Sequence, residues 1–66
     1  MSGGPSKEEI KKYTAEIIQN KPLFNRNLYD AQDAMPWLDP VTYEDARHLV
    51  RGGRLTHDNV EGLFRS

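Results

Sequence analysis

The pattern that begins a helix occurs four times in this 66-residue chain. In each copy, an apolar residue precedes a side chain that can accept a hydrogen bond, and a second apolar residue follows four positions after that side chain. This is the pattern of a hydrophobic staple around an N-cap, where the cap accepts a backbone N–H and the apolar pair packs together. Four helix starts in so short a chain predict an all-α fold. The copies are Pro5-Ser6 with Ile10, Phe24-Asn25 with Tyr29, Leu38-Asp39 with Tyr43, and Leu55-Thr56 with Val60.

The first helix is predicted from Ser6 to Gln19 or Asn20. Glu9 lies three residues after Ser6 and completes a capping box. Pro22 lacks a backbone N–H and disfavours helix at the residue before it, so the helix ends ahead of it. The segment 20–24 is therefore expected to be a loop. The apolar stripe of this helix is Ile10, Tyr13, Ile17 and Ile18.

A second helix is predicted from Asn25 or Asn27 to Met35, because Pro36 follows directly. Its apolar spacing places one set of side chains on a common face, which turns toward the core. That set is Leu28, Ala31, Gln32 and Met35.

The third and fourth helices have clear limits. Asp39 is a cap and Pro40 occupies the first helical position, where its missing N–H costs nothing. The pair 52–53, two glycines, is expected to end the third helix. Thr56 caps a last helix. No segment alternates with period two, so no strand is predicted.

These elements predict a small bundle of three to four short helices, with a flexible N-terminal leader at residues 1–5 and a single small helical domain at 6–66. A chain of this length buries only about 60% of the surface that its unfolded form exposes. Its core is expected to be small. The predicted core is Ile10, Tyr13, Ile17, Leu28, Met35, Leu38, Tyr43, Ala46, Leu49, Val60, Leu63 and Phe64.

Composition excludes several classes of protein. The chain has no cysteine, which removes disulfides, thiolate metal sites and cysteine nucleophiles. Its longest apolar run, 35–38, is far shorter than the roughly 20 residues that cross a bilayer. No basic and apolar leader opens the sequence. We therefore expect an intracellular, cytoplasmic protein with no membrane contact, whose oligomeric state the sequence leaves open.

Charge is distributed unevenly along the chain. Residues 27–46 contain five acidic side chains and no lysine or arginine, whereas residues 47–54 contain three arginines, one histidine and no acid. Complementarity to helix dipoles predicts this order of charges on solvated faces. Alternatively, one face meets a basic partner and another an acidic one. The basic corner consists of Arg47, His48, Arg51 and Arg54.

That basic corner suggests a nucleic-acid contact. The last two predicted helices and the glycine turn between them would then form a helix-turn-helix motif. Two features oppose this interpretation. The second helix would begin with His57 and Asp58, and acidic groups repel phosphates. The isoelectric point near 6.0 is also far below that of a typical nucleic-acid-binding domain.

Enzymatic and metal chemistry have little support in the sequence. Asp30 and Asp33 lie three apart on one helix face, but four short helices hardly enclose the pocket that acid–base work needs, so a solvated face explains the pair. The two histidines are nine residues apart with no third ligand placed nearby. The glycine turn lacks a phosphate-binding motif. We expect no catalytic residue, cofactor, metal or small-molecule substrate.

The apolar group around Trp37 is the strongest indication of recognition. Trp37 lies in a linker between two prolines, where a tryptophan can anchor an interface. In a domain this small, the same side chain can instead close the core. The predicted partner-binding residues are Met35, Trp37, Tyr29, Asp30 and Asp33.

Two segments resemble known families. Gly53-Arg54-Leu55-Thr56-His57-Asp58-Asn59-Val60-Glu61 resembles part of the peripheral subunit-binding domains of 2-oxoacid dehydrogenase acyltransferases, without their preceding loop. Ala34-Met35-Pro36-Trp37-Leu38-Asp39, followed by a helix, a glycine turn and Leu63-Phe64, is similar to ubiquitin-binding modules of the CUE type, with Ala-Met-Pro in place of Met-Phe-Pro. Both resemblances imply a tiny helical domain that binds proteins and catalyses nothing.

The sequence thus predicts a non-enzymatic protein-interaction module, either a small regulatory or adaptor protein or a small subunit of an assembly. It would bind a protein partner through the apolar corner around Trp37, flanked by acidic and arginine patches. The alternative is helix-turn-helix binding of nucleic acid through the basic corner.

Overall fold

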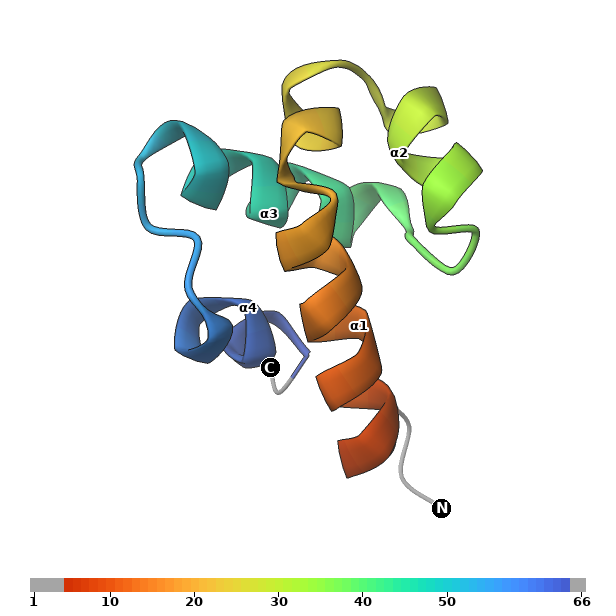
Figure 1. The fold of residues 1–66 in the computed structure, drawn as a ribbon, viewed down its shortest axis with the longest axis vertical. Coiled ribbons are helices and arrows are strands. Elements are labelled where there is room, and N and C mark those ends of the chain that lie inside the picture. Colours follow the sequence, from red (N-terminus) through yellow and green to blue (C-terminus); the bar gives the residue numbers. More distant parts are fainter. Residues whose placement is uncertain (1–4, 65–66) are drawn as a thin grey trace.

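Four α-helices and one 3₁₀ helix make up most of residues 5–64, which are the residues that the computed structural model describes. No strand occurs among them, so the predicted all-α bundle is confirmed. Of the predicted leader, residues 1–4 lie outside the described range. The elements are α1 (Lys7–Gln19), η1 (Lys21–Asn25, the 3₁₀ helix), α2 (Leu28–Ala34), α3 (Pro40–Arg51) and α4 (His57–Leu63), as Figure 1 shows.

Three of the four predicted N-caps form as expected. Ser6 Oγ accepts the Glu9 N–H at 3.2 Å, and Glu9 Oε1 accepts the Ser6 N–H at 2.9 Å, which completes the capping box of α1. Asp39 Oδ1 accepts the N–H of Thr42 at 2.8 Å at the start of α3. Thr56 caps α4 through the N–H of Asn59. Each cap contributes about 1 kcal/mol to helix stability.

The segment predicted as the first loop is instead the 3₁₀ helix η1. Pro22 lies at the start of η1, where its fixed φ suits a helical turn and its missing N–H has no partner to lose. The proline therefore ends α1 and also begins η1. This second effect is what the loop prediction omitted.

The start of α2 also differs from one of the two predicted positions. The N-cap is Asn27, whose Oδ1 accepts the Asp30 N–H at 2.8 Å, because Asn25 already belongs to η1. The predicted staple between Phe24 and Tyr29 is therefore wrong. Phe24 is fully buried, whereas Tyr29 is 83% exposed.

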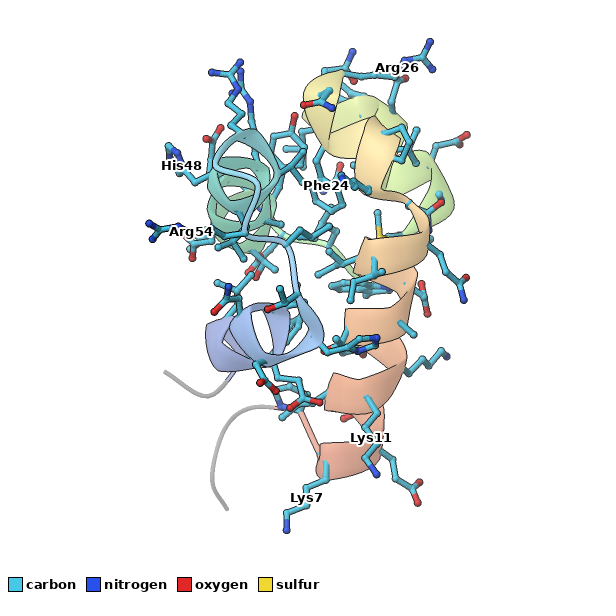
Figure 2. All side chains as sticks on the ribbon, turned by 60° about the vertical axis from the view of Figure 1, so that its left-hand side comes forward. Lys7, Lys11, Phe24, Arg26, His48 and Arg54 are labelled. Atoms are coloured by element: carbon cyan, nitrogen blue, oxygen red, sulfur yellow. The ribbon has the colours of Figure 1, made fainter. Side chains whose placement is uncertain are left out.

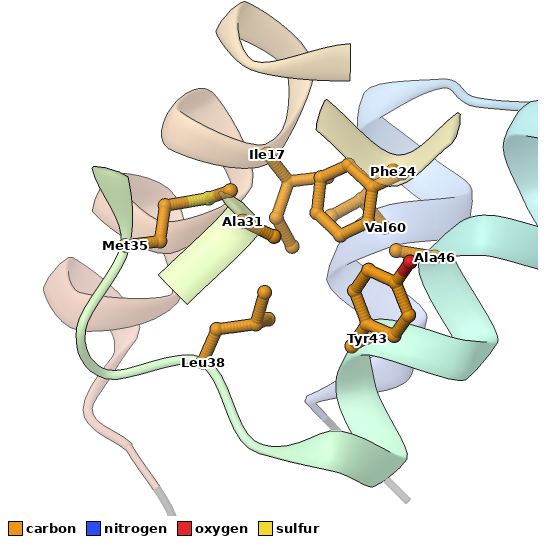
Figure 3. Close-up of a cluster of buried hydrophobic side chains, with 8 residues drawn as sticks. All are labelled: Ile17, Phe24, Ala31, Met35, Leu38, Tyr43, Ala46 and Val60. Atoms are coloured by element: carbon orange, nitrogen blue, oxygen red, sulfur yellow. The ribbon is translucent and has the colours of Figure 1, made fainter. Parts of the chain in front are cut away.

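The core lies where α1, η1, α2, α3 and α4 meet. Phe24 and Ala31 are fully buried although the predicted core omitted them, and the Phe24 ring stacks on Tyr43 with ring centroids 5.6 Å apart. Figure 3 shows this pair facing Ile17 and Leu38. Six predicted core residues are only partly buried: Leu28, Leu49, Leu63 and Phe64 pack against the rim of this cluster, whereas Ile10 and Tyr13 line surface hollows.

Two pairs of elements form most of the packing. α1 packs against α4, and α3 packs against η1. Figure 1 shows α4 lying beside α1, with α2 at the far end of the molecule. Pro5, just before α1, and Leu63, at the end of α4, are thereby brought to the same region.

The predicted glycine stop of α3 is confirmed as a Schellman motif. The Gly53 N–H donates to Val50 O at 3.2 Å and the Arg54 N–H donates to Leu49 O at 2.8 Å. Gly53 has a φ of 69°, in the left-handed region that glycine adopts without a side-chain clash. The turn carries the chain directly into the capped start of α4.

Candidate protein-binding groove

Three aromatic rings from separate parts of the chain meet at one surface. Tyr13 lies on α1, Trp37 lies in the turn between α2 and α3, and Phe64 follows α4. Tyr13 and Trp37 stack with centroids 4.2 Å apart and ring planes 22° apart. Phe64 is tilted against both, at 5.8 Å from Tyr13 and 6.1 Å from Trp37. We call these three residues the aromatic cluster.

Trp37 is held in place by polar contacts as well as by packing. Its Nε1–H donates to Glu16 Oε1 at 2.9 Å. The turn that carries it is closed by the Leu38 N–H, which donates to Met35 O, and by the Gln32 side chain, which donates to Leu38 O. The indole remains half-buried. Trp37 thus packs on the core and also reaches the surface.

An open groove of about 450 Å³ runs along the aromatic cluster. Its walls come from the N-terminal half of α1, the Trp37 turn, the start of α3 and the end of α4. Two of its lining side chains are acidic, and none of the described lining residues is a lysine or an arginine. The lining residues are Pro5, Glu9, Tyr13, Trp37, Asp39, Thr42, Leu63 and Phe64.

Helix capping fixes both carboxylates of this groove. Glu9 belongs to the capping box of α1, and Asp39 is the N-cap of α3. Hydrogen bonds from the side chain and the backbone N–H of Thr42 lower the pKa of Asp39, and these outweigh the opposing effect of burial. Asp39 is therefore ionised at neutral pH, and the groove carries a fixed negative charge at the start of α3.

The structure separates the five predicted partner-binding residues. Trp37 lines the groove. Met35 is fully buried, so its side chain supports the Trp37 turn from below and offers no surface to a partner. Tyr29, Asp30 and Asp33 lie on α2, and none of them lines the groove. Asp30 is also paired with Arg26, with Nε and Oδ2 3.8 Å apart.

Several groove residues were not predicted as a site. Leu63 and Phe64 were assigned to the core from their helical spacing, Tyr13 was placed in the core with a partner contact left open, and Thr42 had no assigned role. Spacing along one helix identifies an apolar side chain but not whether another element covers it. The staple pattern did place Pro5 and Asp39 at helix starts, which is where the structure has them.

The basic corner lies apart from the groove, at the end of α3 and in the turn after it. His48, Arg51 and Arg54 are exposed, and Figure 2 shows His48 and Arg54 projecting from the same side. Arg47 is partly neutralised by Glu44, whose carboxylate lies 3.7 Å from the guanidinium. The first turn of α4 carries Asp58.

A second hollow, of about 410 Å³, lies where the first turns of α1 face α4. Lys7, Ile10, Lys11 and Glu61 line it, and Figure 2 shows Lys7 and Lys11 at this end of the molecule. Its walls carry both signs of charge, and it contains no aromatic side chain among the described residues.

Within residues 5–64, no three histidine or acidic side chains lie close enough together to hold a metal ion. None of the described helices has the length and apolar character needed to span a membrane. Comparison with protein-family models, with curated proteins and with solved structures gave no significant match.

Proposed function

We propose that this chain is a non-enzymatic protein-interaction module that binds a protein partner through the groove beside the aromatic cluster. One observation carries the proposal: Tyr13, Trp37 and Phe64 converge from distant parts of the chain and remain half-buried along an open groove. Aromatic side chains of this kind dominate the binding energy of many protein interfaces.

The rigidity of the groove supports this proposal. Trp37 is held by stacking on Tyr13 and by the hydrogen bond to Glu16, so its rotamer is set before a partner arrives. A side chain that is already ordered loses little conformational entropy on binding. An anchor of this kind favours a peptide segment or a small protrusion over a broad flat surface.

The test is selection of random dodecapeptides displayed on phage against the purified chain, followed by NMR mapping of the recovered peptides. We expect the changes in backbone amide chemical shift that the peptides cause in the chain to cluster on Tyr13, Trp37, Thr42 and Phe64. Phe64→Ala shortens one wall of the groove at the end of α4 and is expected to weaken binding at least tenfold. Tyr29→Ala removes an aromatic ring of similar size outside the groove and is expected to leave binding unchanged.

Two results would contradict the proposal. If the chemical-shift changes cluster on α2 and Tyr29→Ala loses binding, the peptide contacts the acidic face of Asp30 and Asp33 and not the groove. Failure to recover any peptide that shifts groove resonances would remove the groove as a binding site. Circular dichroism of both variants distinguishes lost contact from lost fold.

Nucleic-acid binding through the basic corner is the second candidate function, supported by the exposed side chains of His48, Arg51 and Arg54. Three arginine–phosphate contacts predict a fall in affinity of about 40-fold between 50 and 200 mM salt. Fluorescence polarisation of a labelled DNA duplex measures this slope. The triple substitution of Arg47, Arg51 and Arg54 by alanine would abolish such binding and leave peptide binding in the groove unchanged.

A further inference from the structure

The charged side chains that line the groove, among the described residues, are all acidic. Glu9 and Asp39 lie on its walls, and Glu16 lies behind Trp37 as the acceptor of the indole N–H. No lysine or arginine of residues 5–64 lines it. The nearby lysines Lys7 and Lys11 line the other hollow, toward α4. A partner that enters the groove therefore meets the negative charge of Glu9 and Asp39 on the walls that the structure describes.

Both wall carboxylates keep acceptor capacity after capping their helices. The capping contact of Glu9 uses Oε1, that of Asp39 uses Oδ1, and the Thr42 side chain adds a second hydrogen bond to Asp39. An ionised carboxylate offers about four lone-pair positions. Each cap leaves some of these positions for a donor from outside. Because capping holds both side chains in place, a cationic partner meets acceptors that are already ordered.

The aromatic cluster suits the stem and the head of a basic side chain. Lysine and arginine lay their methylene groups along apolar surface, and their cationic groups are attracted to the faces of tryptophan and tyrosine. The apolar wall formed by Leu63 and Phe64 also offers contact to an uncharged side chain. A volume of about 450 Å³ is enough for a few side chains but not for a folded domain.

From these contacts we infer that the groove takes a cationic, apolar peptide segment of a partner protein, in which lysine or arginine lies next to an aliphatic or aromatic residue. This inference rests on the proposed function and names the chemistry of the partner. The positive side chain pairs with Glu9 and Asp39, and the apolar residue packs on the aromatic cluster.

The inference is tested with a synthetic set of dodecapeptides that all contain one leucine or phenylalanine and no tryptophan. Its matched subsets carry lysine, arginine, acetyl-lysine, citrulline or glutamate beside the apolar residue. Binding is measured through Trp37 fluorescence and confirmed by NMR. We expect the lysine and arginine subsets to bind at least tenfold more tightly than their neutral counterparts, since charge-assisted hydrogen bonds are lost in the latter.

A charge-neutral variant identifies the groups responsible. Glu9→Gln combined with Asp39→Asn keeps an acceptor at both capping positions, because glutamine serves in a capping box and asparagine is a good N-cap. In this variant the preference for basic peptides is expected to fall below threefold, while neutral peptides bind as before. The matched control, Asp33→Asn with Asp45→Asn, removes two exposed carboxylates outside the groove and is expected to keep the preference.

The outcomes separate this inference from the proposed function. Equal binding of basic and neutral peptides in the groove would overturn the inference and leave the interaction module intact. Tighter binding of the glutamate subset, or a preference lost only in the Asp33/Asp45 control, would also overturn it. Sedimentation of the free chain shows whether a second copy fills the groove instead, which would overturn it as well. No groove binding by any subset or by displayed peptides would remove both proposals.

Discussion

Trp37 and Glu16 join two distant parts of the chain: the indole Nε1–H donates to Glu16 Oε1 at 2.9 Å across 21 residues of sequence. The contact fastens the turn between α2 and α3 to the last turn of α1. It also orders the ring that forms part of the proposed binding groove.

Glu16→Ala leaves the partly buried indole N–H without this acceptor. We expect the free energy of unfolding to fall by about 1 kcal/mol, since the lost hydrogen bond involves a charged group that is partly open to solvent. Urea unfolding followed by Trp37 fluorescence measures the change. Glu16→Gln keeps a side-chain oxygen that can accept the indole N–H. It should therefore lose less than half of the unfolding free energy that Glu16→Ala loses. An equal loss in both variants would show that charge, and not the hydrogen bond, is what matters.

Thr14 presents a defect in the core. Its side chain is buried, and its Oγ1 has no hydrogen-bond partner among the described residues. Burying an unpaired hydroxyl costs about 1–3 kcal/mol. Thr14→Val replaces the hydroxyl by a methyl group of similar size, and we expect it to stabilise the fold by about 1 kcal/mol in thermal unfolding. Thr14→Ser keeps the hydroxyl and loses the methyl, so it should destabilise. A stability gain in the serine variant would show that the site is overpacked.

Two glycines should respond to alanine in opposite directions. Gly53 has a φ of 69°, so Gly53→Ala strains the Schellman motif and should cost about 1 kcal/mol. Gly62 lies within α4, and a methyl group there meets no atom within 4 Å. Gly62→Ala should therefore stabilise the domain by about 0.5 kcal/mol. Chemical unfolding of the two variants beside the parent chain tests this contrast, and a change of the same sign in both would contradict it.

Stability should depend on the ionisation of Asp39. Hydrogen bonds from Thr42 lower the pKa of this carboxyl in the folded state below its ordinary value of 3.8. The folded state thus binds the proton less tightly than the unfolded chain does, so this contribution is complete above pH 3.8 and is lost as the pH falls through the folded-state pKa. Denaturant unfolding at a series of acidic pH values follows that loss.

Asp39→Asn provides the control for this pH dependence. Asparagine keeps the N-cap but does not titrate, so the difference in stability between parent and variant should shrink as the pH falls below 3.8. A difference that stays constant across this range would show that Asp39 ionisation makes no contribution.

Local features of the fold were predictable from the sequence. The caps at Ser6, Asp39 and Thr56 depend on residues three positions away, and the stop at Gly52-Gly53 depends on hydrogen bonds between residues at most five positions apart. The segment around Phe24 was less predictable. Pro22 indicates that α1 ends, but only packing against Tyr43 and its neighbours shows that the next residues coil again and bury Phe24.

The candidate site was predictable only in its central residue. Trp37 stands out because it is the single tryptophan, in a linker between prolines. Its partners Tyr13 and Phe64 lie 24 residues before it and 27 after it, and no local pattern relates such positions. Met35 and Trp37 were grouped because they are near neighbours in sequence. The turn instead directs Met35 into the core and leaves Trp37 at the surface.

Pro5 and Phe64, which lie at opposite ends of the described chain, line the same groove. A peptide joined next to Pro5 or Phe64 through a short flexible linker would therefore be held close to the groove that it binds. Such tethering produces effective concentrations in the millimolar range. Peptide segments that bind too weakly to be detected when free would then occupy the groove. Single-chain fusions could therefore rank such segments by how much each raises the unfolding free energy of the domain.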